Sequence, residues 1–430
     1  MVAFVRDRSG FYRELYRDLP DGVDDPARLP VTDKKTLMAR FDEWVTDADV
    51  TIEKVRAFVE DPGLIGERFL GRYTVAATSG TTGVRGIFLM DERSLTITNA
   101  LVFRMMTDWL GITDVVRILA GGARLAMICA TGGHFAEIVA ATRLRKGSRL
   151  RAKAIQVIPA HTPLAEMVAR LNEFRPALIA PYASTAALLA REQEAGRLRI
   201  HPVLLTLSAE GLPEDEYDRI ARAFAAKVRD GYAATECPFL SYSCEEKWCH
   251  VNSDWLVFEP VDAEYRPVAP GGPSHTVLLS NLANQVQPIL RYDLGDSILQ
   301  RPDRCPCGNV LPAVRVRGRT ADVLTFPTDG GEHVSIPPLV FELDEIAGIE
   351  LSQIVQTTPT TLRVRMRPAL GADPDRVWQA VHDSITRLLA EHQIGHVTVE
   401  RGDEPPEQSP GGKYRTVVPL SAAAGGERPS

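Results

Sequence analysis

The sequence predicts an α/β protein with more than one domain, and three observations lead to this expectation. The chain has 430 residues, which is too long for one ordinary domain. Between residues 73 and 240, short apolar runs alternate with amphipathic stretches, as is typical of buried strands layered with helices. After about residue 320, a few strand-like runs surround one long amphipathic stretch. This change of pattern indicates a small α+β unit at the C-terminal end.

The composition is that of a globular protein in water: 44% of the residues are hydrophobic and 24% are charged. The net charge of −7 indicates no general affinity for nucleic acid or for an anionic membrane. No apolar run approaches the roughly 20 residues that cross a bilayer. The first residues carry charges throughout, unlike a secretory signal. We therefore expect a cytoplasmic protein without nucleic-acid or membrane partners.

The elements can be assigned in order along the chain. Residues 1–60 look helical, with prolines ahead of VTDKKTLMARFDEW (31–44), where Thr32 or Asp33 is expected to cap a helix. Apolar runs and amphipathic stretches predict the later strands and helices. The expected strands are 73–77, 86–90, 124–130, 155–160, 177–181, 203–211, 255–261, 276–282, 314–319, 361–367 and 396–401, and the expected helices include 135–146, 164–174 and 376–392.

The segment TSGTTG (78–83) between two predicted strands has four hydroxyl side chains and two glycines. Glycines allow close approach of the backbone to a ligand, and hydroxyl groups add hydrogen-bond donors to the exposed N–H groups. The segment lacks the pattern of a Walker loop, and the flanking strands argue against a flexible linker. These features predict a loop that holds phosphates.

The six cysteines are too few for a disulfide framework in a chain of this length. Cys129 and Cys237 stand alone, whereas Cys244, Cys249, Cys305 and Cys307 form two close groups. In a reducing compartment this spacing favours a metal site over disulfides.

Four segments in this order resemble the adenylate-forming superfamily, which joins a carboxylate to ATP as an acyl-adenylate. They are TSGTTG (78–83), DGYAATE (230–236), RYDLGD (291–296) with RGRTAD (317–322), and SPGGKYR (409–415). FYRELYRDL (11–19), LPVTDKKTL (29–37), GGHFAE (132–137) and CPCG (305–308) resemble the phenylacetate–CoA ligase branch. The resemblance implies a large, multi-subdomain N-terminal adenylation domain over 1–320. It also implies a small mobile C-terminal lid domain over 321–420, followed by a flexible tail at 421–430.

The resemblance also implies a set of site residues. Lys413, Glu236 and Thr235 would be catalytic, with Thr235 at the α-phosphate and Glu236 binding Mg²⁺, an ion that prefers oxygen ligands. Lys413 would enter the site on a mobile loop to stabilise the developing adenylate. The residues implied to bind ATP are Thr78, Ser79, Gly80, Thr81, Thr82, Gly83, Glu210, Tyr232, Asp296 and Arg319. Taken singly, most of these residues could be ordinary turn, surface or core residues, but the ordered set favours the functional interpretation.

Three departures from the family pattern bear on this interpretation. The phosphate loop continues with Val84 and Arg85, and Arg85 could act as a cation or lie in solvent. Ala233 follows Tyr232 where the family has glycine. Ala321 stands where the family commonly has the hinge Asp or Lys, with Asp322 following. This last departure leaves the transfer step more open than the adenylation step.

Three thiols and one imidazole, from Cys244, His250, Cys305 and Cys307, would form a closed tetrahedral Zn²⁺ site of the structural kind. Cys249, next to His250, competes as a ligand. The alternative is a set of reduced, buried cysteines with a surface histidine.

The resemblance implies that CATGGHFAEIVAA (129–141) lines the acyl pocket, as in the phenylacetate–CoA ligase branch. Small residues there, Gly133 among them, leave room for a ring and Phe135 offers an apolar wall, which favours an aryl or arylacetic acid. His134 could contact the substrate, or it could be a helix-capping or core residue. The predicted function is ATP-dependent activation of this acid with release of pyrophosphate, followed by transfer to CoA as co-substrate. The alternatives are transfer to an amine or another small nucleophile, and a catalytically silent binding homologue. A homodimer is compatible with the sequence.

Overall fold

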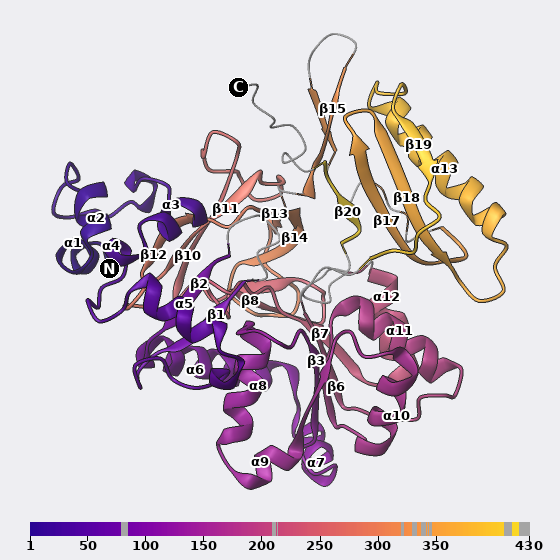
Figure 1. Ribbon diagram of the computed structural model, residues 1–430, viewed down its shortest axis with the longest axis horizontal. Helices are drawn as coiled ribbons and strands as arrows, with labels where there is room; N and C mark the ends of the chain where they lie inside the picture. The colour runs from indigo at the N-terminus through magenta and orange to yellow at the C-terminus, as the bar shows by residue number, and fades with distance from the viewer. Residues whose placement is uncertain are drawn as a thin grey trace. The chain divides into compact units, whose positions relative to one another are not determined.

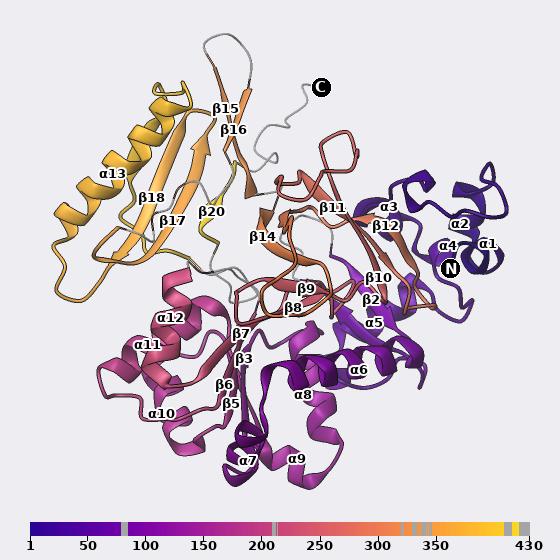
Figure 2. The same ribbon diagram turned by 180° about the vertical axis from the view of Figure 1, so that it is seen from behind.

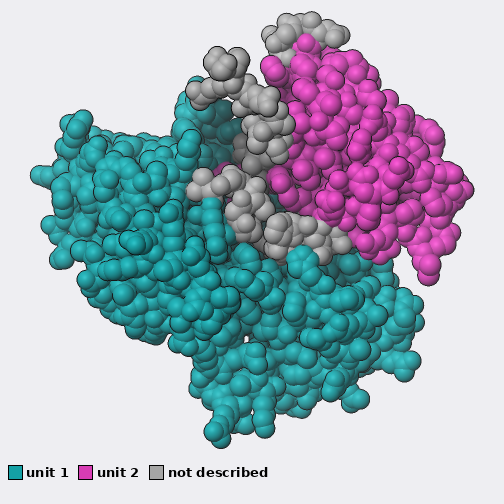
Figure 3. Space-filling model, viewed as in Figure 1, with its two compact units in different colours: residues 1–294, 298–316, 410–413 teal, residues 295–297, 317–409, 414–430 magenta. Residues whose placement is uncertain are grey.

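The computed structural model describes residues 1–78, 85–208, 212, 214–319, 322–328, 333–336, 341, 343, 346–407 and 415–420. These residues fall into two compact units, shown in different colours in Figure 3. Unit 1 contains 1–294 and 298–316. Unit 2 contains 295–297 together with the described residues from 317 onward. The domain boundary expected at 320 stays a prediction.

A five-stranded parallel sheet forms the centre of one half of unit 1 (Figure 1), with the strand order β4-β3-β5-β6-β7. Its strands are β3 (Leu125–Cys129), β4 (Ile155–Pro159), β5 (Leu178–Ala180), β6 (Leu204–Leu207) and β7 (Lys227–Asp230). The associated helices are α6 (Glu92–Trp109), α7 (Ile112–Ala120), α8 (Ala136–Lys146), α9 (Arg149–Ala154), α10 (Leu164–Phe174), α11 (Ala183–Glu194) and α12 (Glu214–Phe224). Parallel strands joined through helices bury both faces of the sheet. Accordingly, Ile128, Ile179 and Leu205 of the strands share one core with Leu171 and Leu189 of the helices.

Antiparallel strands form the other half of unit 1. A three-stranded sheet has the order β10-β11-β12, a four-stranded sheet has the order β13-β14-β9-β8, and β1 pairs with β2 in a hairpin. The bounds are β1 (Thr74–Ala77), β2 (Ile87–Met90), β8 (Ser241–Ser243), β9 (Cys249–Val251), β10 (Leu256–Val261), β11 (Thr276–Asn281), β12 (Ile289–Asp293), β13 (Asp296–Gln300) and β14 (Ala313–Arg319).

The N-terminal segment consists of short helices that pack on the β1–β2 hairpin and on β12. They are α1 (Val2–Arg8), α2 (Gly10–Leu15), η1 (Pro26–Arg28), α3 (Lys34–Ala39), α4 (Phe41–Trp44), α5 (Ile52–Glu60) and η2 (Pro62–Leu64). Trp44 and Tyr12 are fully buried in the core that they share with Phe88 and Tyr292. Asp33 caps α3, because its side chain accepts a hydrogen bond from the backbone N–H of Thr36.

Unit 2 is built on a four-stranded sheet with the order β19-β18-β17-β20, together with the β15–β16 hairpin. Helix α13 runs alongside this sheet in both ribbon views (Figures 1 and 2) and contributes Val381, Ile385 and Leu389 to the core. The bounds are β15 (Leu324–Pro327), β16 (His333–Ile336), β17 (Ile349–Thr358), β18 (Thr361–Pro368), α13 (Pro374–Glu391), β19 (Thr398–Arg401) and β20 (Val417–Val418).

The predicted α/β class is confirmed, and most of the predicted apolar runs match a strand to within a residue or two. The run 203–211 extends past the end of β6, and strands such as β7, β12 and β17 were not predicted. The run predicted at 124–130 forms β3, and the stretch predicted at 376–392 forms α13. The helix expected across 31–44 is divided into α3 and α4 at Arg40, which leaves the helical conformation. Among the helices in the described ranges, none has the length and apolar character needed to cross a membrane.

Candidate functional site

The carboxyl ends of the parallel strands bring several predicted site segments to one edge of the sheet. The segment 131–135 follows β3, and the segment 231–236 follows β7. Residue Glu210, which comes after β6, lies outside the described residues. In open α/β sheets, ligands bind beyond the carboxyl ends of the strands. This edge of the sheet is therefore the candidate active site.

The β1–β2 hairpin holds the predicted phosphate loop at both ends. The backbone N–H of Thr78 donates to the Gly86 carbonyl at 2.9 Å, and the Gly86 N–H donates to the Thr78 hydroxyl at 2.8 Å. The Ala77 N–H donates to the His134 carbonyl at 2.6 Å, which ties the hairpin to the segment after β3. The loop residues Ser79, Gly80, Thr81, Thr82 and Gly83 lie outside the described residues, whereas Arg85 is described and exposed.

Glu236 is buried and is held by two side chains that the sequence did not single out. The Tyr292 hydroxyl donates to Glu236 Oε1 at 2.9 Å, and Lys34 Nζ lies 3.3 Å from the same oxygen. Burial, together with the negative charge of Glu236, raises the pKa of Tyr292 far above its usual value. Tyr292 therefore stays protonated and acts as a permanent donor. Among the described residues, no side chain or backbone group is hydrogen-bonded to Glu236 Oε2, so this oxygen can accept a further ligand.

The N-terminal segment fixes the strand that carries Tyr292. The Tyr12 hydroxyl and the Trp44 indole N–H both donate to the Pro288 carbonyl, at 3.0 and 2.6 Å. The Thr32 hydroxyl donates to the Leu290 carbonyl at 3.0 Å. Because Lys34 follows Thr32 by two residues, the same contacts bring its ammonium group to Glu236. The opening helices thus position part of the site.

The other predicted ATP-site residues occupy defined positions in the fold. Tyr232 is half-buried, and its ring packs edge-on against Phe258 at 6.4 Å between centroids. Thr235 is half-buried next to Glu236. Asp296 begins β13 and is buried, and the backbone of Arg319 ends β14, while its side chain lies outside the described set.

His134 is a core residue rather than a cap. Its ring is 1% exposed, lies 5.3 Å from the ring of Phe58, and has no hydrogen-bond partner among the described residues. Burial lowers the pKa of His134, and the nearby carbonyls of Val59 and Leu64 oppose this shift only in part. Phe135 begins α8 as its N-cap residue and is half-buried. A side chain on Gly133 would meet the Phe135 ring at 3.2 Å.

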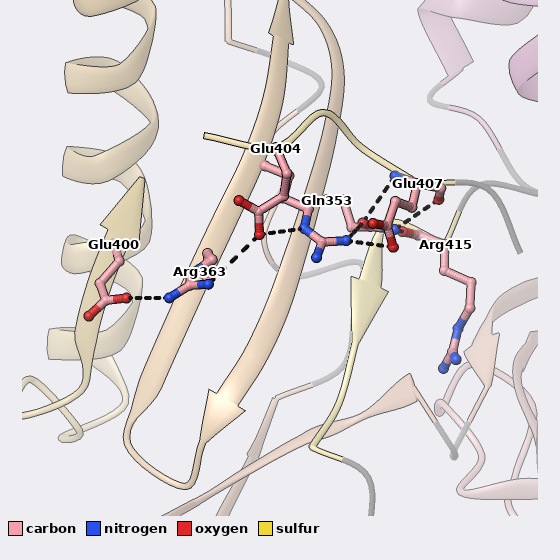
Figure 4. A network of polar contacts seen from close by, with 7 residues as sticks. Gln353, Arg363, Glu400, Glu404, Glu407 and Arg415 are labelled. Carbon is pink, nitrogen blue, oxygen red and sulfur yellow. Dashed lines mark hydrogen bonds and ion pairs between the residues drawn. The ribbon is translucent and has the colours of Figure 1, made fainter. Parts of the chain in front are cut away.

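Lys413 lies outside the described residues, but both chain segments that flank it are fixed by one buried side chain of unit 2. Gln353 on β17 is 3% exposed. Its side-chain N–H groups donate to the carbonyls of Glu407 and Arg415 at 3.2 and 3.0 Å, while its Oε1 accepts from the Glu407 N–H (Figure 4). Arg365 donates to Gln353 Oε1 and pairs with Glu407. Glu407 and Arg415, the described residues on either side of 408–414, are therefore both held by β17.

The four predicted metal ligands meet although they come from distant parts of the sequence. The ligand atoms of Cys244, His250, Cys305 and Cys307 all lie within 4.8 Å of one another. Cys244 Sγ is 3.7 Å from Cys305 Sγ, and Cys307 Sγ is 3.2 Å from His250 Nε2. The other ring nitrogen of His250, Nδ1, is 2.9 Å from the Leu311 carbonyl. A backbone acceptor at Nδ1 orients the imidazole with Nε2 toward the thiols, as is usual for histidines that bind metals.

Cys249, the competing ligand, is not part of this cluster. Successive residues of a strand point to opposite faces, and β9 places His250 among the ligands while Cys249 packs with Val251, Leu279 and Ile298 in a separate core. Burial raises the pKa of Cys249 well above its usual value, as expected for an inert thiol.

Sequence reasoning missed Lys34, Tyr292 and Gln353. Two of them lie inside segments that were singled out, since Lys34 is in LPVTDKKTL and Tyr292 is in RYDLGD. Gln353 lies in a segment without any signal of this kind. The strand 349–358 has several other polar residues, so nothing in the sequence distinguished Gln353.

No family model matches the chain. A phenylacetate–coenzyme A ligase of Thermus thermophilus is 24% identical, with 98% of this chain and 94% of that protein covered. A 2-hydroxyisobutyryl-CoA ligase structure with a bound acyl-adenylate matches 98% of this chain and 87% of its own, at 20% identity and a TM-score of 0.66. An amide bond synthetase of Marinactinospora thermotolerans matches 78% of this chain and 66% of its own, at 12% identity and a TM-score of 0.52. These similarities confirm the resemblance inferred from the motifs, and the structural ones show the fold.

Proposed function

We propose that this chain, which has the fold of the adenylate-forming ligases and a full-length similarity to a phenylacetate–CoA ligase, is an AMP-forming carboxylate–CoA ligase. It activates a carboxylic acid with ATP as an acyl-adenylate, releases pyrophosphate, and transfers the acyl group to CoA. The main structural support is the edge where the phosphate-loop hairpin, the segment after β3 and the buried Glu236 come together.

The attacking carboxylate and the α-phosphate are both anionic, so the site must compensate negative charge without blocking in-line attack. In the proposed arrangement, the N–H groups and hydroxyls of 78–83 hold the outer phosphates and Thr235 contacts the α-phosphate. Tyr232 and Asp296 bind adenine and ribose, together with Arg319 and Glu210. Lys413 supplies a positive charge while the adenylate forms.

Glu236 fits the proposed magnesium site. Its Oε1 is occupied by Tyr292 and Lys34, whereas Oε2 has no protein partner in the described ranges. A magnesium ion bound there with ATP would neutralise phosphate charge. Tyr292 and Lys34 hold the carboxylate at Oε1 and fix its orientation, so that the other oxygen is the one offered to the nucleotide.

Cys244, His250, Cys305 and Cys307 suit a structural zinc ion. Three thiols and one imidazole provide the full tetrahedral set, and such closed sites leave no open position for catalysis. The ligands come from the β8–β9 turn, from β9 and from the loop that precedes β14. Zinc would therefore fasten that loop to the sheet that continues toward Arg319.

For the acid, Gly133 and Phe135 support a small aryl or arylacetic substrate. The additional Cβ of any larger residue at position 133 would press on the Phe135 ring, so the glycine keeps this ring in place as an apolar wall. A cytoplasmic location and a homodimer stay predictions.

Two measurements test the function. ATP–pyrophosphate exchange is measured with benzoate, phenylacetate, 2-hydroxyisobutyrate and hexanoate, using Glu236→Gln as the inactive control. We expect the wild-type protein to catalyse exchange with an aryl acid, and we expect Glu236→Gln to lose this exchange activity. Absence of exchange with every acid would instead support a silent binding homologue.

The acceptor is tested separately with the acid that supports exchange. CoA and a set of primary amines are supplied in parallel, and the thioester and amide products are quantified. We expect the thioester to form faster. An amide product without a thioester would favour the amine-transferring alternative, a chemistry named for one protein of similar fold.

A further inference from the structure

A basic cavity lies at the opposite edge of the parallel sheet from the candidate active site. It has a volume of about 340 Å³, and its lining includes Arg117, Arg124, Arg175, Arg199 and His201. These residues precede β3, β5 and β6 or end the helices that lead into them, so the cavity faces the amino ends of the strands. Glu236 and the segment 131–135 lie beyond the carboxyl ends of the strands, and the cavity is thus separate from the candidate active site.

Four separate segments bring the arginines together. Arg117 is in the last turn of α7, Arg124 directly precedes β3, Arg175 is the C-cap of α10, and Arg199 lies in the loop before β6. Two of the guanidinium groups are anchored through Nε: Arg124 donates to the Arg175 carbonyl at 3.0 Å and Arg199 to the Gly196 carbonyl at 2.9 Å. Anchoring through Nε leaves the outer nitrogens to face solvent or a ligand.

None of these four guanidinium groups has a carboxylate partner within 4.0 Å in the described ranges, although neighbouring arginines do. Arg170 on α10 pairs with Glu166 at 2.6 Å, and Arg197, two residues before Arg199, pairs with Glu192 at 2.6 Å. The whole chain carries a net charge of −7. The four arginines at the cavity therefore differ from neighbouring surface arginines, which have carboxylate partners. They also form a positively charged cluster in a chain whose net charge is negative.

Helix dipoles account for only part of this cluster. Cations stabilise the carboxyl ends of helices, which explains Arg117 on α7 and Arg175 on α10. Arg124 and Arg199 instead precede strands, and strands have only small dipoles. Four like charges that converge on one cavity repel each other, and a bound anion would relieve this repulsion.

The lining also indicates the kind of anion. Arginine side chains bind phosphate oxygens with two parallel hydrogen bonds, which favours a phosphate group over a single-atom anion. Beside the arginines, the cavity is lined by Pro176, Ile200 and Val203. We propose that this cavity is a binding site for a dianionic phosphate group, carried by a small organic phosphate or free in solution, and distinct from the ATP site.

Equilibrium titration tests the proposal, with inorganic phosphate and phenyl phosphate as probes at constant ionic strength. Wild type is compared with the pocket variant Arg124→Ala/Arg199→Ala and with a matched control, Arg170→Ala/Arg197→Ala, which removes two paired surface arginines. We expect the pocket variant to bind phosphate about tenfold more weakly or worse, because charge-assisted hydrogen bonds are lost. The control should match wild type. Tighter binding of phenyl phosphate would identify an organic phosphate as the ligand, and equal binding would identify free phosphate.

Equal phosphate affinity in wild type and the pocket variant would overturn the proposal, because the measured binding would then belong to the ATP site. ATP–pyrophosphate exchange by the pocket variant should stay at the wild-type level, since neither arginine belongs to the active site. Should the pocket variant fail to fold, a crystal of the wild-type protein soaked in sodium tungstate decides the question. Tungstate density between Arg124 and Arg199 supports the site, and density confined to the phosphate loop overturns it.

Discussion

At the scale of single residues, the arrangement around Glu236 explains how a buried carboxylate is held in a fixed orientation. Leaving a buried charge without hydrogen bonds is costly, and here Tyr292 and Lys34 satisfy one oxygen while the other stays available. Tyr292 and Lys34 have different roles. The Tyr292 hydroxyl, which stays protonated, fixes the orientation of the Glu236 carboxylate, and the ammonium group of Lys34 balances its charge.

Tyr292→Phe tests this division of roles. Removing a donor to a buried carboxylate should lower the free energy of unfolding by about 1–3 kcal/mol, measured by urea denaturation. A partner that orients a metal-binding carboxylate should affect exchange as well, by about 10–100-fold. The matched control is Tyr242→Phe, which removes a hydroxyl that donates to Asp108 at 2.5 Å away from the site. If both variants keep the wild-type exchange rate, Tyr292 is only structural.

His134 provides a pH prediction with a defined sign. Burial lowers the pKa of His134 in the folded state below the usual value of a histidine, so the unfolded state binds more protons. Above about pH 6.5, neutral His134 makes its full contribution to the free energy of unfolding. This contribution is lost as the pH falls toward the folded-state pKa, by at most about 1.4 kcal/mol per pH unit. His134→Phe should lose less stability than wild type between pH 7.5 and 5.5 in urea denaturation. A parallel loss in both proteins would contradict this.

At the scale of elements, the strand β9 shows how alternation separates two adjacent residues that the sequence left in competition. His250 joins Cys244, Cys305 and Cys307, while Cys249 faces another core.

Cys305→Ser with Cys307→Ser should release metal and lower the melting temperature, because structural zinc contributes folding free energy directly. Metal content is measured on purified protein. Cys249→Ser serves as the control and should keep the wild-type metal content. Loss of the metal there would reinstate Cys249 as a ligand.

The strand β17 carries two buried glutamines that form a matched pair for a second test. Gln353 holds the carbonyls of Glu407 and Arg415, whereas Gln356 donates to the Thr325 carbonyl at 2.9 Å. Each substitution by alanine should lower the free energy of unfolding by about 1–3 kcal/mol, since buried partners lose a hydrogen bond. Only Gln353→Ala should also slow adenylate formation, because it releases both ends of the segment that carries Lys413. Equal adenylation rates in the two variants would show that this anchoring does not matter.

At the scale of the whole molecule, the sequence predicts features that depend on short segments, such as individual helices and strands and closely spaced groups of ligand residues. Apolar runs give β3, α10 and α13 nearly to the residue, and the clustered cysteines give three members of the group that could hold a metal. The contacts of Lys34 with Glu236 and of Gln353 with Glu407 and Arg415 could not be predicted. They join residues far apart in the chain, and nothing in a strand or loop pattern specifies its distant partner. The site residues of the ATP motifs stay predictions that rest on the resemblance.

The last prediction concerns Lys413 and rests on the role in adenylate formation that the resemblance implies for it. A lysine that approaches ATP only while the adenylate forms is needed to make this intermediate but not to consume it. Losing one preorganised charge at that transition state should cost about 10²–10³ in rate, so Lys413→Ala should nearly abolish ATP–pyrophosphate exchange. Supplied with synthetic acyl-adenylate and CoA, the same variant should form the thioester at close to the wild-type rate, as followed by chromatography. A lysine without a role would leave both half-reactions normal, and a lysine needed for folding would damage both. The uneven result alone supports the proposed role of Lys413 in adenylate formation.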